Sequence, residues 1–338
     1  MKSKRHFADG WCNNILRKFP SAVSDARELY DNKASYGDAW PDWCGLPMAA
    51  TYAIITQWAD MSNTQKIMTQ VGVDALADVT AALLWRKTKA CYKFDPTLHK
   101  ELAKNTRIEK LPVDVFYRLP YHCVFIEGPI TTDDTSIKGF FAWMERDANS
   151  GIPELRLLFL LQDMNTIPIP IIMTGGKLHV QDSTNALLAS AIKNIKASSY
   201  QTIGLLTGAA TSLDDIFDDV KKAAINLVLY LCSSNAAPEL TPIQRPTDKH
   251  GDVLHFHRWD VGARFGKAVR AQRAASEQGD GASGTKGSES SRKSSKPHIN
   301  RCSWNHYWTG PKTGEQELIL QWITPTLVSI ENDDDAPV

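Results

Sequence analysis

Four short apolar runs between residues 122 and 173 constrain the fold of this chain more than any other feature. The runs are rich in β-branched and aromatic residues and are bounded by Gly, Pro, Asp and Asn, which is typical of strands. They are His122–Glu127, Ile137–Glu145, Glu154–Leu161 and Ile167–Met173. No helical pattern separates them, so the runs predict an antiparallel meander.

Helical patterns lie on both sides of this meander, because apolar residues there recur at helical spacing. The expected helices are Ala22–Tyr30, Leu46–Met61, Val71–Tyr92, Ser183–Lys196, Leu213–Ser233 and Val261–Ala275. We therefore predict a single domain of the α+β class, in which N-terminal helices pack on a mainly antiparallel sheet. A C-terminal hairpin of Ile299–Trp308 and Leu318–Ile323 is expected to complete that sheet.

Composition shifts divide the chain into five expected regions. A Gly- and Ser-rich stretch with few apolar residues predicts a flexible loop, and a cluster of acidic residues predicts a C-terminal tail. The regions are a helical part (1–115), the sheet with the central helices of the same core (116–275), the flexible loop (276–297), the C-terminal hairpin (298–330) and the acidic tail (331–338).

Several absences in the sequence indicate a cytoplasmic protein. No apolar segment typical of a secretory leader follows the basic start, and no apolar stretch approaches the length of a membrane span. The six cysteines are scattered without a C-x-x-C pair, which favours reduced structural thiols. We expect no membrane partner, no metal and no other cofactor.

The net charge of zero excludes a uniformly basic nucleic-acid-binding protein, but it conceals a polarised C-terminal quarter. Residues 253–312 hold 11 basic and 4 acidic side chains, whereas residues 313–338 hold 6 acidic side chains and no basic one. The strongest functional signal in the sequence is therefore expected near the basic stretch.

The helix predicted from Val261 carries a basic stripe. Arg264, Lys267 and Arg270 follow one another at three-residue spacing, so they share a face, and Arg258 and Trp259 precede the helix. This face can contact phosphate or an acidic protein surface, or it can be merely solvated. All five residues are candidates for binding a peptide or RNA.

Three histidines lie close together at positions 250, 255 and 257. His255 and His257 would share a face on a strand, but a metal would need further ligands and acid–base chemistry would need a partner. A polar surface strand is the third interpretation.

The segment Lys296–Lys312 interleaves aromatic and polar residues. Further binding candidates from this segment are His298, Arg301, Trp304, His306, Tyr307 and Trp308. Such a pattern suits stacking on bases, a hot spot for peptide binding, or a buried aromatic strand that seals the core.

The same segment carries a family resemblance, together with other stretches in the same order between about residue 110 and residue 330. These stretches are Leu119–Phe125, Ile137–Ala142, Leu229–Cys232, Val261–Gly266 and Gln321–Val328. Together they resemble a family, carried by phages and plasmids, that includes a type V-A anti-CRISPR protein.

The resemblance implies an inhibitor of type V-A effector biogenesis. Such a protein recognises the N-terminal peptide of the effector nuclease as the nascent chain leaves the ribosome, and the effector mRNA is lost. The implied partners are this peptide, the ribosome or mRNA, and a host RNase.

This chain departs from the family pattern where two histidines flank a tryptophan. It has Ser303 and Asn305 there, with His306 one place further on, and Asn300–Arg301 replaces a pair of arginines. No catalytic residue is assigned, and these departures favour a binding protein over a nuclease. The alternative is an RNA-binding or RNA-cleaving accessory protein of a plasmid or phage.

Overall fold

The structure is a computed structural model, and it describes most of the chain. The described residues are 6–56, 72–106, 111–130, 137–147, 151–173, 213–240, 243–279, 298–299, 302–311, 313, 316–323 and 327–328. The helix expected at Ser183–Lys196, most of the expected flexible loop (276–297) and the expected acidic tail (331–338) lie outside these residues.

Helices dominate the first third of the chain, and strands follow. The helical elements are α1 (Phe7–Arg17), α2 (Ala22–Asp31), η1 (Lys33–Ala39), α3 (Met48–Thr56), α5 (Gly72–Thr88), α6 (Pro96–Lys100), η3 (Glu101–Asn105), η4 (Val113–Arg118), α9 (Leu213–Cys232) and α10 (Ala263–Gly279). The strands are β1 (Ala90–Phe94), β2 (Cys123–Glu127), β3 (Ile137–Arg146), β4 (Pro153–Leu161), β5 (Thr166–Ile172), β6 (His257–Val261), β7 (His298–Ile299), β8 (Ser303–Thr309), β9 (Glu317–Ile323) and β10 (Leu327–Val328).

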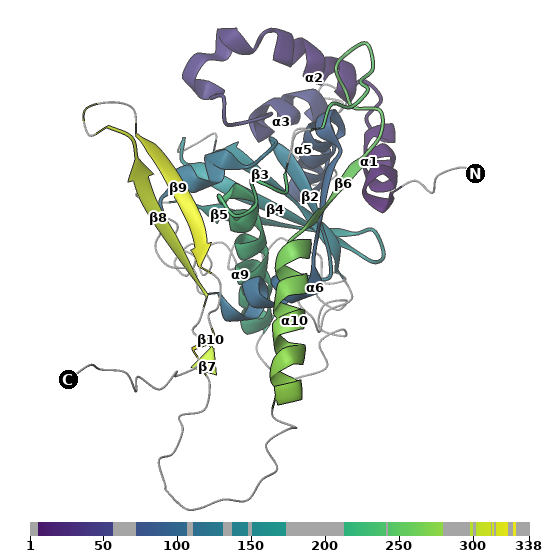
Figure 1. Ribbon diagram of the computed structural model, residues 1–338. Coiled ribbons are helices and arrows are strands. Elements are labelled where there is room, and N and C mark those ends of the chain that lie inside the picture. The colour runs from purple at the N-terminus through teal and green to yellow at the C-terminus, as the bar shows by residue number, and fades with distance from the viewer. Residues whose placement is uncertain are drawn as a thin grey trace, which may run out of the picture.

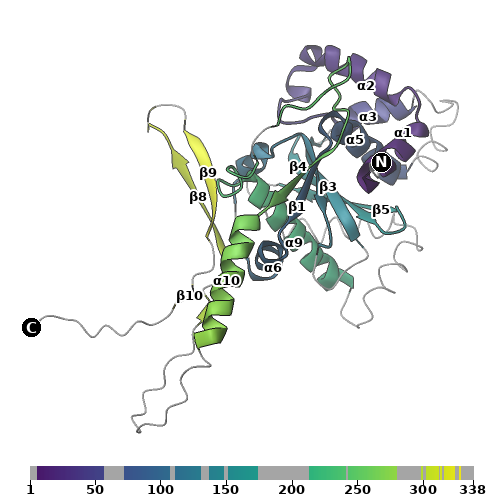
Figure 2. The ribbon, with the colours of Figure 1, turned by 45° about the vertical axis from the view of Figure 1, so that its right-hand side comes forward.

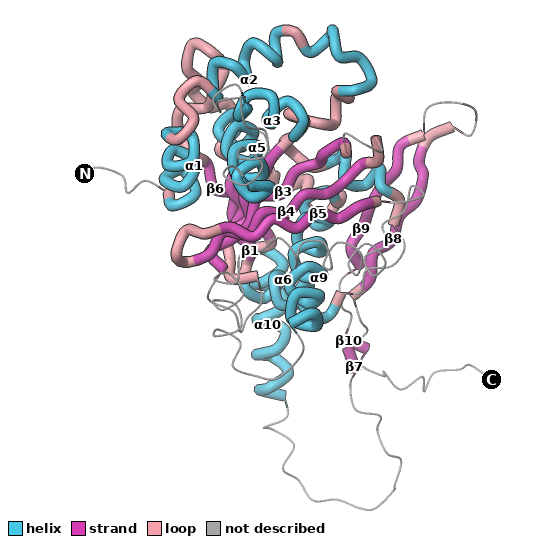
Figure 3. Tube along the Cα trace, turned by 180° about the vertical axis from the view of Figure 1, so that it is seen from behind, coloured by secondary structure: helices cyan, strands magenta, loops and turns pink. Residues whose placement is uncertain are grey.

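A six-stranded sheet in the order β5-β4-β3-β2-β1-β6 forms the middle layer of the fold. Helices α1, α2, α3 and α5 cover one face, and α6, α9 and α10 lie on the other side (Figures 1 and 3). Each face has its own apolar core, because successive side chains along a strand point to opposite faces. The predicted meander is confirmed, since β2 to β5 pair antiparallel in chain order.

The predicted α+β class is also confirmed, but the sheet contains two parallel pairings that were not expected. β1 pairs in parallel with β2 on one side and with β6 on the other. The helix predicted for Val71–Tyr92 is too long at its C-terminal end, because α5 stops at Thr88 and Lys89 adopts a positive φ of 42°. The chain then enters β1, whose burial on both faces hides the alternation that would mark a strand.

The C-terminal hairpin does not complete the central sheet, and the prediction of this connection is wrong. Among the residues that the structure describes, β8 and β9 pair only with each other, as a separate two-stranded sheet that stands beside α9 and α10 (Figure 2). The cause is a better partner for β9, which bonds to the turn after α9. The Ser234 N–H donates to the Leu320 carbonyl (2.9 Å), and Asn235 exchanges two hydrogen bonds with the Trp322 backbone (2.7 and 3.1 Å).

A buried polar network fixes the hairpin to the helical layer. The Trp304 indole N–H donates to Asn226 Oδ1 (2.8 Å), and the Asn226 amide donates to the Thr106 carbonyl (3.1 Å). The Trp322 indole N–H donates to Thr106 Oγ1 (3.0 Å). Each polar group in the network thus finds a partner, which is the condition for burying it without a large cost.

The first strand of the predicted hairpin is also shorter than expected. His298–Ile299 forms β7 and pairs antiparallel with Leu327–Val328, and β8 starts only at Ser303. Cys302 lies between them in an isolated parallel bridge with Thr106, which interrupts the strand.

Glu145 is a buried carboxyl that holds the start of α3. It accepts hydrogen bonds from the Met48 N–H (3.1 and 3.2 Å) and the Arg146 N–H (3.1 Å). Burial raises its pKa to about 7, against the opposing effect of the Met48 N–H.

This raised pKa predicts a pH-dependent stability. The folded state binds a proton at Glu145 that the unfolded state releases near its ordinary pKa of 4.5, so the stability falls as pH rises from about 4.5 to 7. At about 1.4 kcal/mol per pKa unit, the full effect is roughly 3 kcal/mol. The Glu145→Gln variant cannot ionise at this position. Its free energy of unfolding relative to wild type, from urea titrations, is therefore expected to rise between pH 5 and pH 8. A difference independent of pH would contradict a raised pKa at Glu145.

Among the residues that the structure describes, no helix is long and apolar enough to cross a membrane.

Candidate functional site

β6 forms one edge of the central sheet, and its outer side has no strand partner among the described residues. The His257 N–H donates to the Lys89 carbonyl (3.2 Å), and the Val261 carbonyl accepts a bond from the chain that follows β1 (2.8 Å). Alternate residues of a strand direct their backbone groups to opposite sides, so the odd-numbered residues of β6 face β1. Arg258 and Asp260 therefore direct their N–H and C=O groups outward.

The opposite edge of the sheet is blocked by proline. The Met173 N–H donates to the Pro153 carbonyl (3.2 Å), so the odd-numbered residues of β5 face β4. Pro168 and Pro170 consequently lie at the free side, where they offer no N–H donor and resist strand addition. The two edges thus differ, and only β6 presents N–H donors and C=O acceptors at successive outward positions.

An aromatic cluster lies behind the open edge. The Trp259 ring is buried and stacks on Tyr92, with ring centroids 5.2 Å apart, and Tyr121 packs at 6.0 Å. The Arg245 guanidinium lies over both Trp259 (5.4 Å) and Tyr121 (5.6 Å), and it donates to the Thr88 carbonyl. Burial and the Arg245 charge lower the pKa of His257 at the start of β6, which favours its neutral form.

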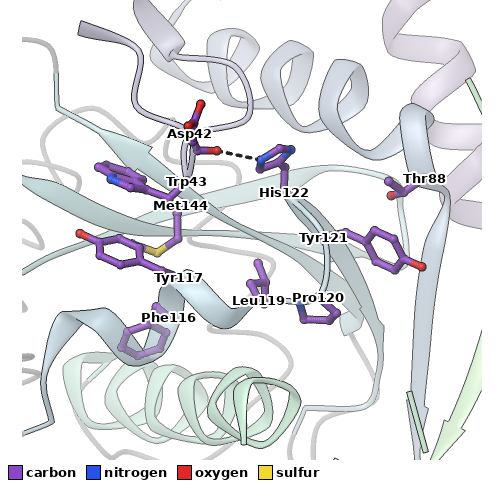
Figure 4. A pocket seen from close by; sticks show the side chains of 10 residues that line it. All are labelled: Asp42, Trp43, Thr88, Phe116, Tyr117, Leu119, Pro120, Tyr121, His122 and Met144. Carbon is purple, nitrogen blue, oxygen red and sulfur yellow. Dashed lines mark hydrogen bonds between the residues drawn. The ribbon is translucent and has the colours of Figure 1, made fainter. Parts of the chain in front are cut away.

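Tyr121 also lines a cavity of about 300 Å³ at the start of β2 (Figure 4). Its walls include Trp43 and Tyr117, which stack at 5.1 Å, and His122, which donates to the Asp42 carbonyl (3.1 Å). Aromatic walls with a few polar groups are typical of pockets that hold an apolar or aromatic side chain. The pocket residues were not among the sequence candidates, although Tyr121 and His122 fall within the segment Leu119–Phe125 that carries the resemblance.

The basic face of α10 is smaller than the sequence predicts. Arg264 and Lys267 are exposed and have no ion pair among the described residues. Arg270 instead forms a bidentate pair with Asp95 (2.9 and 3.0 Å) and donates to Thr97 (2.8 Å). Its charge is therefore used to attach α10 to the start of α6. Arg258, one residue into β6, is exposed and lies 3.5 Å from Asp260.

Two glycines in the segment Val261–Gly266 lie where the structure leaves no room for a side chain. Gly262 has a φ of +78°, and a Cβ there would lie 2.1 Å from Leu98. A Cβ at Gly266 would lie 2.0 Å from the Asp95 carboxylate. Both glycines let α10 approach the α6 segment closely enough for Arg270 to reach Asp95.

The β8–β9 hairpin has both buried and exposed aromatic residues. Trp304 is 3% exposed, so its ring belongs to the core and is not available to a partner. Tyr307 and Trp308 are 46% and 53% exposed, and His306 is also exposed. The Arg118–Glu317 ion pair (2.6 Å) ties the end of the hairpin that holds Trp308 to η4, which contributes Tyr117 to the pocket.

The structure describes only some of the remaining candidate residues from the sequence analysis. The backbone of His298 pairs with Val328, and Arg301 lies outside the described residues. His250, His255 and His257 form no group with metal-ligand separations among the residues that the structure describes. His255 precedes β6 and does not share a strand with His257.

Fold and site together describe a mixed α+β protein with an open strand edge, an aromatic pocket and an exposed aromatic hairpin. The sequence matches the anti-CRISPR type V subtype A2 (AcrVA2-like) family over residues 92–330, and the chain belongs to this family. The match covers most of the chain and begins at β1.

Two other proteins are similar to this chain. The crystal structure of AcrVA2 has a similar fold, with a TM-score of 0.59 over 96% of this chain and 100% of that chain, at 19% sequence identity. Protein FinQ of Escherichia coli is 25% identical over 277 residues, which cover 76% of this chain and 77% of FinQ. Family membership supports an anti-CRISPR role directed at a type V-A system.

Proposed function

We propose that this protein lowers the production of a type V-A effector nuclease by binding the effector's N-terminal peptide as it leaves the ribosome. Binding at that stage leads to loss of the effector mRNA, through the ribosome or a host RNase, in the bacterial cytoplasm. Membership of the anti-CRISPR type V subtype A2 family supports the target system.

The observation that carries the proposal is the open edge of β6. A nascent N-terminal segment is extended and has unpaired backbone groups, so it can add to a sheet edge as a further strand. Arg258 and Asp260 offer N–H and C=O groups for this pairing, whereas the prolines of β5 exclude it at the other edge. Main-chain pairing supplies affinity, and the pocket beside Tyr121 supplies a place for one side chain of the peptide.

Direct binding of a synthetic peptide tests the proposal. Fluorescence anisotropy with a labelled peptide of the effector N-terminus is expected to show saturable binding to the purified protein. A scrambled peptide of the same composition serves as the control, because it keeps the charge and changes the order of side chains. No saturation with the native peptide, or equal binding of the scrambled one, would overturn the proposal.

RNA binding is the second candidate function, and the exposure of Arg264 and Lys267 favours it. If α10 binds phosphates, RNA affinity is expected to fall steeply with salt, and the Arg264→Ala/Lys267→Ala variant should show a smaller salt slope. Arg270 is unsuitable for this test, since its substitution breaks the pair with Asp95. A salt response that is the same in both proteins would remove this candidate.

A further inference from the structure

Three possible metal ligands meet on the face of the sheet that α1 covers, away from the pocket. His6 precedes α1, Cys91 belongs to β1, and Glu127 ends β2. Their ligand atoms all lie within 4.8 Å of one another. The peptide proposal above uses none of these residues.

The separations of these atoms are close to those of a tetrahedral zinc site. His6 Nε2 lies 3.0 Å from Glu127 Oε1, Cys91 Sγ lies 3.4 Å from the same oxygen, and Cys91 Sγ lies 3.8 Å from His6 Nε2. Zinc bonds of about 2.0 Å to nitrogen and oxygen and about 2.3 Å to sulfur, at tetrahedral angles, place such atoms roughly 3.3–3.6 Å apart. Each observed distance differs from this by about 0.3 Å or less, so the three atoms already approximate one face of the tetrahedron.

The donor set and its surroundings also suit zinc. A thiolate, an imidazole and a carboxylate are the three ligand types that zinc accepts, and the two negative charges would balance the ion. The side chains of His6 and Glu127 are only 9% and 11% exposed, and Cys91 is buried. Three phenylalanine rings, Phe7, Phe125 and Phe256, pack around the His6 ring at centroid distances of 4.3, 5.9 and 4.7 Å. An apolar shell of this kind limits water access to the ligands.

Without a cation, the cluster holds a proton where a metal would bind. Burial and the Glu127 carboxylate raise the pKa of Cys91, so the thiol keeps its proton and donates to Glu127. Burial raises the pKa of Glu127, but hydrogen bonds from His6 and Cys91 outweigh this and lower it. Zinc would displace the thiol proton and coordinate both groups, which makes binding release a proton.

Two neighbouring features disfavour the binding of a zinc ion at these residues. The Ala8 N–H donates to His6 Nδ1 (3.3 Å), and zinc on Nε2 would put the imidazole proton on Nδ1, so this helix cap would be lost. The Arg258 charge also acts on both Cys91 and Glu127, and Asp260 at 3.5 Å offsets part of it. Zinc binding is therefore expected to leave the Ala8 N–H without its acceptor, while the metal itself holds His6 against β1 and β2.

We propose that His6, Cys91 and Glu127 form a zinc site that fastens the start of α1 to β1 and β2, with solvent in the fourth position. Two of these ligands, His6 and Cys91, precede the segment that matches the family, and Glu127 lies within it.

Zinc titration of tag-free, metal-free protein tests the site. The expected result is one zinc per chain by elemental analysis, a thiolate-to-cobalt charge-transfer band when cobalt replaces zinc, and a melting temperature that rises with zinc concentration. The His6→Gln and Cys91→Ser variants should lose all three. Melting temperatures of both variants measured without zinc separate loss of metal from loss of folding.

The matched control is Cys232→Ala, which removes a buried thiol from α9 and should bind zinc as wild type does. Hydrogen exchange should quicken at the Ala8 amide when zinc is added. Zinc below one equivalent in folded wild type, or equal zinc in the His6→Gln variant, would overturn the proposal. Either outcome leaves the peptide assay unaffected, because no residue of the cluster takes part in strand addition.

Discussion

The Trp322→Ala variant is expected to lose about 4 kcal/mol of the free energy of unfolding, the largest stability effect that we predict. Trp322 is 2% exposed and packs edge-on against Tyr230 (5.8 Å) and Phe265 (5.3 Å), so it joins β9 to both α9 and α10. Large-to-small substitution of a buried tryptophan costs about 3–5 kcal/mol. The substitution also leaves the Thr106 hydroxyl without its indole donor. Guanidinium titration followed by circular dichroism measures this loss.

The matched control lies in the same hairpin. Trp308 is 53% exposed on β8, so Trp308→Ala should change the free energy of unfolding by only about 0.5 kcal/mol. Similar losses in the two variants would contradict the docking of β9 on the helical layer.

The Arg258→Pro variant is expected to bind the effector peptide about tenfold more weakly while the protein remains folded. Proline removes the outward N–H at position 258 and places its ring where an added strand would lie. No bond between β6 and β1 is lost, because that N–H does not face β1. A loss of about 1.4 kcal/mol corresponds to tenfold in affinity, and a neutral hydrogen bond contributes up to about this much.

The Arg258→Gln variant distinguishes the contribution of the backbone N–H to peptide affinity from that of the guanidinium charge. It keeps the N–H and removes the guanidinium, so it should bind the peptide nearly as wild type does. If Arg258→Pro binds normally with an unchanged melting temperature, the peptide does not pair with β6. If Arg258→Gln is equally weak, the guanidinium and not the backbone carries the affinity.

The sequence predicts the part of the fold that depends on neighbouring segments. The meander follows from four runs of β-branched and aromatic residues with turn residues between them, so each strand pairs with the next. β1 and β6 could not be found in this way, since their pairing joins Ala90 to His257 and depends on contacts far apart in the chain. The position of the hairpin was also unpredictable, because Asn226 and Asn235 on and after α9 decide it.

The candidate site, like the fold, combines features that the local sequence predicts with features that depend on distant segments. The position of Arg258 and Trp259 before a basic helix identifies both residues as candidates, but it does not predict their different roles. Alternation places Arg258 at the surface of β6 and buries Trp259, and this depends on which face of the strand meets α9. The pocket around Tyr121 needs Trp43 from a distant segment, so no local pattern predicts it.

The most direct test of the central claim is the level of effector mRNA in cells with and without this protein, for three versions of the effector gene. The first is native, the second has synonymous codons over its N-terminal segment, and the third encodes a different N-terminal peptide with few nucleotide changes. Recognition of the nascent peptide predicts that the first two mRNAs fall and the third stays constant. A synonymous gene that escapes, or an altered peptide that remains sensitive, would show that the protein does not recognise the peptide.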